Sequence, residues 1–372
     1  MTHTDEVAEA RARDAAIHYG HKTPAKRKKP VRYGLITSRC KAVADRIAFP
    51  AQSSVLDEAA LFLRVVKAYD LDRPSDCRFL SRGDSDVYRV CASGKRYYLK
   101  VYRPPHGLPR AEAEARFVRD LHAAGAPVVP PVPRRDGRYA CEAVAAEGRR
   151  PILLFEEAPV AAFSAANVAD CCALGRAVAT LHDTADSLDQ KYDLPVFDGV
   201  WVLNRMFPYA RSYLSPRDYA YTRQLLERVT GLLHGLPTSL PHFGVCHRDL
   251  ALSNIRQTED GRITFFDFGD ASYTWRAYEL AALRERLPGD GAPCSASGRR
   301  DALLEGYSAI RAVPAGIPEC IPALVLLGRL LWFCAAMAKC PLRMGTDGFS
   351  EQFICKELSV ARDLEAQLPA GA

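Results

Sequence analysis

The chain lacks several features that would mark a secreted or membrane-spanning protein. None of its 12 cysteines belongs to a Cys-x-x-Cys pair, so we expect neither a disulfide framework nor a zinc site. The N-terminus is polar and has no apolar segment of the signal-peptide kind. The longest apolar run, residues 321–338, contains Pro322 and Arg329, which predicts a buried helix and no membrane span. Together these absences predict a soluble, cytoplasmic protein with reduced cysteines.

The composition is that of a globular protein with an appended basic segment. Of the 372 residues, 48% are hydrophobic and 25% are charged, and no internal repeat is present. Residues 22–32 hold much of the net charge of +6 and include two prolines. Such a run is most simply a solvated tail, the alternative being contact with nucleic acid or an acidic partner. Because no aromatic residue is interleaved with it, nucleic-acid binding is not expected.

One pair of motifs carries a specific chemistry. Residues 247–254 read His-Arg-Asp-Leu-Ala-Leu-Ser-Asn, and Asp-Phe-Gly follows at 267–269. In this order and spacing, H-R-D-x-x-x-x-N and D-F-G form the catalytic apparatus of kinase-type phosphoryl transfer. Asp249 is the candidate base for a hydroxyl proton, and Asn254 and Asp267 are the candidate ligands that hold Mg²⁺ against the phosphates of ATP. Either motif alone arises by chance, whereas both together in this order rarely do.

The segment that joins the two motifs has the pattern of a β-hairpin. Glu259-Asp260-Gly261 supplies a turn, and the alternating apolar residues Ile263 and Phe265 predict a returning strand. Because a hairpin brings the chain back to its start, we expect Asp267 to lie beside Asn254.

Upstream of the motifs, alternating residues predict three strands joined by tight turns, over 78–80, 87–90 and 97–102. The first turn is built from small and polar residues that let backbone N–H groups approach phosphate oxygens, and the candidates are Ser81, Gly83 and Ser85. A single glycine is a weak signal, and a plain hairpin is the alternative. Lys100 strengthens the phosphate interpretation, because a lysine inside an apolar strand needs an anionic partner.

A glutamate on the following helix is the expected partner of that lysine. The helix over 110–124 offers Glu112 and Glu114, and Glu114 is favoured because Phe117 and Leu121 place it on the core-facing side. Further strands are expected after the Pro-rich turn at 125–132 and over 139–144 and 151–156. The strand pattern ends at Ala158-Pro159, where a hinge between two lobes is expected. The adenine is expected to bond to main-chain groups from Glu156 to Ala158, and only the position of this segment supports that expectation.

The second half of the chain is predicted to be mainly helical. Apolar spacing predicts helices over 173–182, 216–234, 299–311, 321–339 and 350–367. His182 is interpreted as an ordinary helix-end residue. Residues 198–221 are rich in aromatic and arginine side chains, which either pack a helical core or line a cleft for the acceptor. Residues 295–372 contain eight Lys/Arg and eight Asp/Glu residues and so show no acidic excess.

These segments resemble the aminoglycoside phosphotransferase / choline kinase family, the small-molecule branch of the protein-kinase-like fold. The resemblance runs from about Phe79 to Leu283 and rests on the two motifs, on Leu-Lys-Val-Tyr-Arg-Pro at 99–104, on Leu-Gly-Arg-Ala-Val-Ala-Thr-Leu-His at 174–182 and on Tyr-Glu-Leu-Ala at 278–281. It implies a two-lobed α/β (α+β) fold with a small antiparallel-sheet N-lobe and a mostly helical C-lobe. It also implies ATP and Mg²⁺ as cofactors and a hydroxyl-bearing small molecule, such as an antibiotic or metabolite, as acceptor. Because the family tends to place acceptor contacts in the region that corresponds to 295–372, which has no acidic excess here, a neutral or anionic acceptor is expected in preference to a polycationic one.

The family's residue roles carry over by position. Asp249 resembles the catalytic base, Asn254 and Asp267 resemble the metal ligands, and Lys100 and Glu114 resemble the ion pair that binds phosphates. We therefore divide the chain into a basic arm over 1–50, a nucleotide-binding N-lobe over 51–157, and a C-lobe with the catalytic loop and the acceptor site over 158–372.

The chain also departs from the family pattern. Arg248 stands where glycine is usual, and Glu279 replaces the usual aspartate. Tyr278 follows Asp267 by only eleven positions, and no Ala-Pro-Glu follows, which leaves no room for a phosphorylated activation loop and favours a small-molecule kinase. Two alternatives stay open. One is a protein Ser/Thr kinase of the bacterial stress-response type, which the Lys-Val-Tyr-Arg-Pro stretch resembles, and the other is a non-catalytic nucleotide-binding protein.

Overall fold

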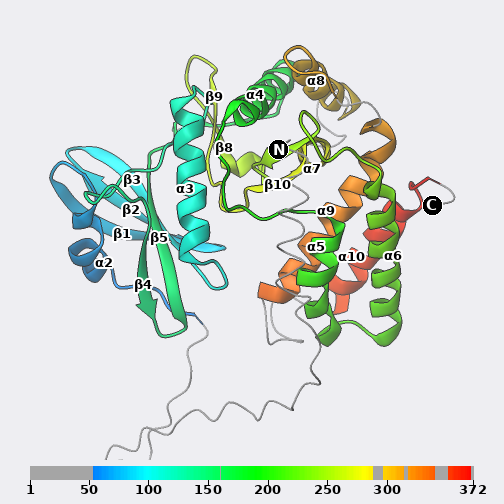
Figure 1. Cartoon of the computed structure of the whole chain (residues 1–372), viewed down its shortest axis with the longest axis horizontal. Helices are drawn as coiled ribbons and strands as arrows, with labels where there is room; N and C mark the ends of the chain where they lie inside the picture. The colour runs from blue at the N-terminus through cyan, green and yellow to red at the C-terminus, as the bar shows by residue number, and fades with distance from the viewer. Residues whose placement is uncertain (1–52, 160, 288–295, 314–316, 340–350, 370–372) are drawn as a thin grey trace, which may run out of the picture.

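The computed structural model of the chain describes residues 53–159, 161–287, 296–313, 317–339 and 351–369 (Figure 1). The basic arm expected over 1–50 lies outside these residues. The described part has two lobes, one built around a sheet and the other mainly helical, as the sequence predicted.

The N-lobe is a five-stranded antiparallel sheet in the order β1-β2-β3-β5-β4. The strands are β1 (Pro74–Arg82), β2 (Ser85–Ala92), β3 (Lys95–Tyr102), β4 (Cys141–Ala145) and β5 (Gly148–Glu156). Helix α2 (Glu58–Arg64) and helix α3 (Leu108–Ala123) complete the lobe, and α3 lies between the sheet and the helical lobe (Figure 1). The expected strand after the Pro-rich turn does not form, because Val128 and Pro131 make only isolated bridges.

The alternation of β3 decides which of its residues reach the site. Leu99 and Val101 are fully buried in the core that the sheet shares with α2. Because successive side chains of a strand point to opposite faces, Lys100 and Tyr102 face the other way. There Tyr102 packs in a small cluster with alanines of α3. This periodicity places the lysine beside the glutamate-bearing helix.

The C-lobe contains the helices that the apolar spacing predicted. They are α4 (Val168–Ser187), α6 (Pro216–His234), α8 (Ala296–Ser308), α9 (Ile317–Lys339) and α10 (Glu351–Glu365), and α7 (Arg276–Arg286) holds the Tyr-Glu-Leu-Ala segment. By length and composition alone, the segment Cys320–Met337 of α9 could cross a membrane. It packs instead against α6, α7 and α10, and Leu326, Leu327 and Met337 are fully buried in the core of this lobe.

Two short β-ladders hold the catalytic motifs between the lobes. The predicted hairpin is present as β8 (Ile255–Gln257) and β9 (Ile263–Phe265), and Gly261 takes the left-handed conformation, φ +84°, that its turn requires. Strand β7 (Phe243–Cys246) pairs antiparallel with β10 (Ser272–Trp275). Strand β7 ends directly before the H-R-D motif, and β9 and β10 flank D-F-G, so both motifs are anchored by strand pairing.

Candidate active site

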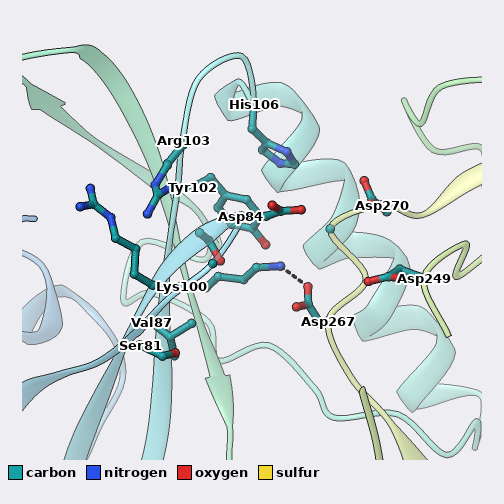
Figure 2. A pocket seen from close by; sticks show the side chains of 14 residues that line it. Ser81, Asp84, Val87, Lys100, Tyr102, Arg103, His106, Asp249, Asp267 and Asp270 are labelled. Carbon is teal, nitrogen blue, oxygen red and sulfur yellow. Dashed lines mark hydrogen bonds and ion pairs between the residues drawn. The ribbon is translucent and has the colours of Figure 1, made fainter. Parts of the chain in front are cut away.

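A cleft of about 280 Å³ lies between the β1–β2 hairpin, the end of β3 and the two catalytic motifs (Figure 2). Six of the residues predicted from sequence line it: Ser81, Gly83, Ser85, Lys100, Asp249 and Asp267. Four others do not border it: Glu114, Asn254, Glu156 and Ala158. Glu156 ends β5 and donates its backbone N–H to the Pro130 carbonyl at 3.1 Å, and Ala158 follows in the connection between the lobes.

The hairpin that covers the cleft is tighter than the sequence suggested. Ser81 belongs to β1 and Ser85 to β2, so the turn consists of Gly83 and Asp84. The N–H of Gly83 donates to the carbonyl of Ser85 at 2.9 Å. That backbone donor is therefore engaged within the turn in this state.

A buried ion-pair network anchors the base of this hairpin, and no pattern in the sequence pointed to it. Asp86 is fully buried and accepts hydrogen bonds from Arg150 at 2.8 Å and Arg103 at 2.7 Å. Burial opposes the charge on Asp86, but the two guanidinium groups outweigh it and hold its pKa below the usual value. Because Arg150 also donates to the carbonyls of Tyr102 and Val101 at 3.0 and 3.1 Å, the network ties the hairpin to β3.

Lys100 lies between two carboxylates. Its Nζ bonds to Asp267 and lies 3.7 Å from Glu114 Oε1. Glu112 instead accepts the backbone N–H of Ala140 at 2.9 Å, so Glu114 is the glutamate that faces the lysine. Burial opposes the charge on Lys100, yet Asp267 and Glu114 outweigh it and raise its pKa.

Tyr102 fixes the glutamate from the opposite side. Its hydroxyl donates to Glu114 Oε2 at 2.7 Å, and Lys100 Nζ lies 4.5 Å from the centre of its ring. Burial raises the pKa of Glu114 against the opposing effect of Lys100. Glu114 therefore remains incompletely compensated while the lysine is bonded to Asp267.

The catalytic loop presents Asp249 with two partners. Asn254 donates from Nδ2 to the backbone carbonyl of Asp249 at 2.9 Å and to its Oδ2 at 3.2 Å. Arg286, near the end of α7, donates to Asp249 Oδ1 at 2.9 Å. The backbone N–H of Phe266 donates to the carbonyl of Asn254 at 3.2 Å, which places Asp267 beside Asn254 as the hairpin predicted.

His247 links the two motifs. Its Nδ1 accepts the N–H of Asp249 at 3.3 Å, so Nε2 carries the proton and donates to the Phe266 carbonyl at 2.9 Å. Its ring also packs against Phe268 at 4.3 Å between centroids. Asp267 itself has a φ of 68°, a conformation rare outside glycine. These bonds hold the D-F-G backbone in the turn that points its carboxylate into the cleft.

Glu279 anchors the backbone of the H-R-D motif, a role that no pattern in the sequence indicated. It is 1% exposed and accepts the backbone N–H groups of His247, at 3.3 Å, and Arg248. His182 donates to the same carboxylate at 2.8 Å. The interpretation of His182 as an ordinary helix-end residue was wrong, because it lies inside α4 and is fully buried.

Close packing of α4 and α8 explains the position of His182. A Cβ added to Gly175 would lie 2.0 Å from the Leu303 carbonyl oxygen, so only glycine permits this approach. It brings Tyr307 of α8 to 3.0 Å from His182 Nδ1. Burial and the charge of Arg276 lower the pKa of His182 to about 4, and the neutral ring therefore connects Tyr307 to Glu279 in a chain of hydrogen bonds.

Most of the aromatic side chains between 198 and 221 pack a core. Phe207 and Tyr213 are buried, and Phe207 stacks on Tyr219 with centroids 4.4 Å apart. Tyr221 donates to Glu365 at 2.8 Å. Of the two interpretations left open by the sequence, core packing holds for these residues, while Tyr209 is half exposed.

Comparisons with known proteins identify the family of the chain. The family model described as "Phosphotransferase enzyme family" matches residues 76–313. An uncharacterized protein of Deinococcus radiodurans is 32% identical over 311 residues, which are 82% of this chain and 89% of that protein. Amicoumacin kinase of Bacillus subtilis is 28% identical over 217 residues, which are 55% of this chain and 61% of that protein.

Solved structures share the fold. An amicoumacin kinase in complex with AMP-PNP, Ca²⁺ and Ami superposes with a TM-score of 0.69 at 19% identity, over 83% of this chain and 93% of that one. A microcompartment-associated aminopropanol kinase gives 0.63 at 21% identity, over 82% and 95%. At these identities the likeness concerns the fold, and the family match carries the assignment. The chain belongs to the phosphotransferase enzyme family, and it is a kinase with an alcohol group as acceptor.

Proposed function

We propose that this protein transfers the γ-phosphoryl group of ATP to a hydroxyl of a small molecule, with Asp249 as the base. The observation that carries the proposal is the convergence of Lys100, Asp249 and Asp267 on one cleft beneath a hairpin. A lysine for the phosphates, a carboxylate for the metal and a second carboxylate for the hydroxyl proton are the parts that this reaction needs.

The base is positioned before any acceptor arrives. Arg286 and Asn254 both bond to the carboxylate of Asp249, which restricts its rotation. A carboxylate held in this way orients the attacking hydroxyl and accepts its proton as the bond to phosphorus forms. The exposed side of Asp249 is the side on which the hydroxyl would lie.

Asn254 and Asp267 fit a hard cation such as Mg²⁺. Nδ2 of Asn254 is engaged by Asp249, which leaves its amide oxygen, and Asp267 supplies a carboxylate; both are oxygen ligands of the kind that Mg²⁺ prefers. Asp84 and Asp270 also line the cleft, so polyphosphate would enter an acidic site. When bound, the cation supplies the positive charge that makes phosphates and carboxylates compatible there.

Nucleotide binding would redistribute the contacts of Lys100. The lysine is bonded to Asp267, while Glu114 lies at 3.7 Å with its Oε1 lacking a hydrogen-bond partner among the described residues. Phosphates and metal together would free Lys100 to bind the α- and β-phosphates and pair with Glu114. The adenine would bond to main-chain groups between Glu156 and Ala158, with Ser81, Gly83 and Ser85 covering the phosphates.

The acceptor is expected to be neutral or anionic. Arg286 and Arg248 flank Asp249, and the guanidinium of Arg248 pairs with Asp270 at 2.7 Å and lies 4.8 Å from the centre of the Phe197 ring. Because Asp270 and Asp249 are already paired with these arginines, the two carboxylates would compensate several ammonium groups of an acceptor poorly. A screen that includes both antibiotics and metabolites would show which of the two classes contains the preferred acceptor.

An ATP-depletion screen tests the proposal. Wild-type protein, Asp249→Asn and Asp267→Ala would be assayed with Mg²⁺ against sugars, nucleosides, amino alcohols, neutral antibiotics, kanamycin and casein. We expect a small neutral or anionic compound to be phosphorylated, and Asp249→Asn to lose about 10²–10⁴-fold in turnover. Turnover of Asp249→Asn within a few-fold of wild type would contradict the assigned base, and preference for casein or for kanamycin would contradict the acceptor class.

A further inference from the structure

His106 borders the proposed phosphate cleft but belongs to neither catalytic motif. It lies on the loop between β3 and α3 and lines the cleft with Lys100 and Asp249 (Figure 2). Its ring stacks on Tyr102, with centroids 4.2 Å apart and planes inclined by 17°. Because the Tyr102 hydroxyl is itself held by Glu114 at 2.7 Å, the imidazole is fixed beside the phosphate-binding lysine.

The ring carries a polar atom that the protein does not use. Nε2 of His106 is buried and has no hydrogen-bond partner among the described residues. Burial, then Arg110 and Lys100, lower the pKa of His106 to about 3. The ring is therefore neutral near pH 7, and as the Nε2–H tautomer it offers one donor. A buried donor left unpaired is unfavourable, and because the ring of His106 lines the cleft, a small rotation of the ring would bring this donor to a ligand acceptor there.

The position of His106 in the cleft indicates that it would contact the γ-phosphate end of the nucleotide. Arg110, in the first turn of α3, donates to the carbonyls of Gly269 at 3.1 Å and Ala271 at 2.7 Å, so the start of α3 lies against the D-F-G segment. Lys100 is assigned to the α- and β-phosphates and Asp249 to the hydroxyl. The group transferred between them would cross the cleft that Asp267, Gly269 and His106 line together.

We propose that the imidazole of His106 donates a hydrogen bond from Nε2 to the γ-phosphoryl group during transfer, which makes His106 a further catalytic residue. The inference rests on the proposed function of the cleft. It requires the contact to be specific for the third phosphate, because the α- and β-phosphates have Lys100 as their partner.

Calorimetric titration with two nucleotides tests this specificity without knowledge of the acceptor. Wild type and His106→Ala would be titrated with AMP-PNP and with ADP, each with Mg²⁺. We expect His106→Ala to weaken AMP-PNP binding by about tenfold or more, the loss of one hydrogen bond to a charged group, and to leave ADP binding within about twofold. His122→Ala is the matched control, since His122 is an exposed histidine of α3, and it should change neither affinity.

Conservative variants separate donation from packing. His106→Gln places an amide N–H near the position of Nε2 and should restore most of the AMP-PNP affinity, whereas His106→Asn, which mimics Nδ1, should not. If His106→Ala fails to fold by circular dichroism, this pair carries the test. Equal weakening of both nucleotides, no weakening of either, or equal affinities of the Gln and Asn variants would overturn the inference. Wild-type protein that binds neither nucleotide would overturn the proposed function, and the inference with it.

Discussion

Replacing Glu279 by glutamine is the sharpest test of how the catalytic loop is held. The carboxylate accepts three N–H donors, two from the backbone of His247 and Arg248 and one from His182. Glutamine keeps the shape but has one acceptor oxygen and an NH₂ group. In Glu279→Gln at least one buried N–H would therefore face another donor.

The expected loss of stability follows from the hydrogen bonds that glutamine cannot accept. A hydrogen bond to a charged group contributes roughly 1.5–3 kcal/mol, and a buried donor left unpaired costs about 1–3 kcal/mol. Arg248 also has a φ of 69°, a left-handed conformation that costs about 1–2 kcal/mol and that the bond to Glu279 helps to offset. We expect Glu279→Gln to lower the free energy of unfolding by about 3 kcal/mol. A displacement of Asp249 by about 1 Å would lower turnover by about 10²-fold.

Urea unfolding and turnover would be measured on the same preparations. Glu285→Gln is the matched control, because Glu285 is on the same helix but its side chain is 42% exposed. Its ion pair with Arg300 joins Oε1 to the guanidinium at 3.6 Å. Exposed pairs of this kind contribute about 0–1 kcal/mol. If Glu279→Gln unfolds at the same urea concentration as Glu285→Gln and retains its turnover, Glu279 does not hold the loop.

Three other perturbations have defined outcomes. The pKa of His182 is lowered from 6.5 to about 4, so between pH 6.5 and pH 4 the unfolded chain binds a proton that the folded chain does not. The free energy of unfolding should therefore fall by up to about 3 kcal/mol from pH 7 to pH 4. A decline just as steep in His182→Gln would refute this. Arg286→Gln should lower turnover about tenfold or more with unchanged nucleotide affinity, and weaker nucleotide binding would contradict it. A protein starting near residue 46 should keep its activity, and loss of turnover with the fold intact would show that the arm contributes to the acceptor site or to a dimer contact.

Local patterns in the sequence were enough to predict the elements that hold the candidate site residues. Alternation along β3 and the apolar spacing of α3 predicted that Lys100 and Glu114 face each other, and they lie 3.7 Å apart. The hairpin between the motifs predicted that Asp267 returns to Asn254. Each of these inferences depends on a period of two or 3.6 residues, or on a short loop, which a single sequence displays directly.

The buried side-chain pairs that hold the site in place could not be predicted in the same way. Asp86 and Arg150 are 64 residues apart, and His182 and Glu279 are 97 residues apart. No local period signals such a pair, because the partners meet only when separate elements pack. Gly175 permits the close packing of α4 on α8, but the helix that it approaches could not be inferred from the sequence. Buried ion pairs and hydrogen-bond chains are therefore the part of this site that required the structure.

The segment after D-F-G is fixed by contacts that need no phosphate. Arg110 donates to the carbonyls of Gly269 and Ala271, and Arg248 pairs with Asp270 at 2.7 Å. In regulated protein kinases, phosphorylation orders the corresponding loop by creating new arginine–phosphate pairs. Here the carboxylate of Asp270 already pairs with Arg248, and the segment between Asp267 and Tyr278 is too short to move far. We therefore expect the unmodified protein to be fully active, with turnover that does not depend on phosphorylation of this segment.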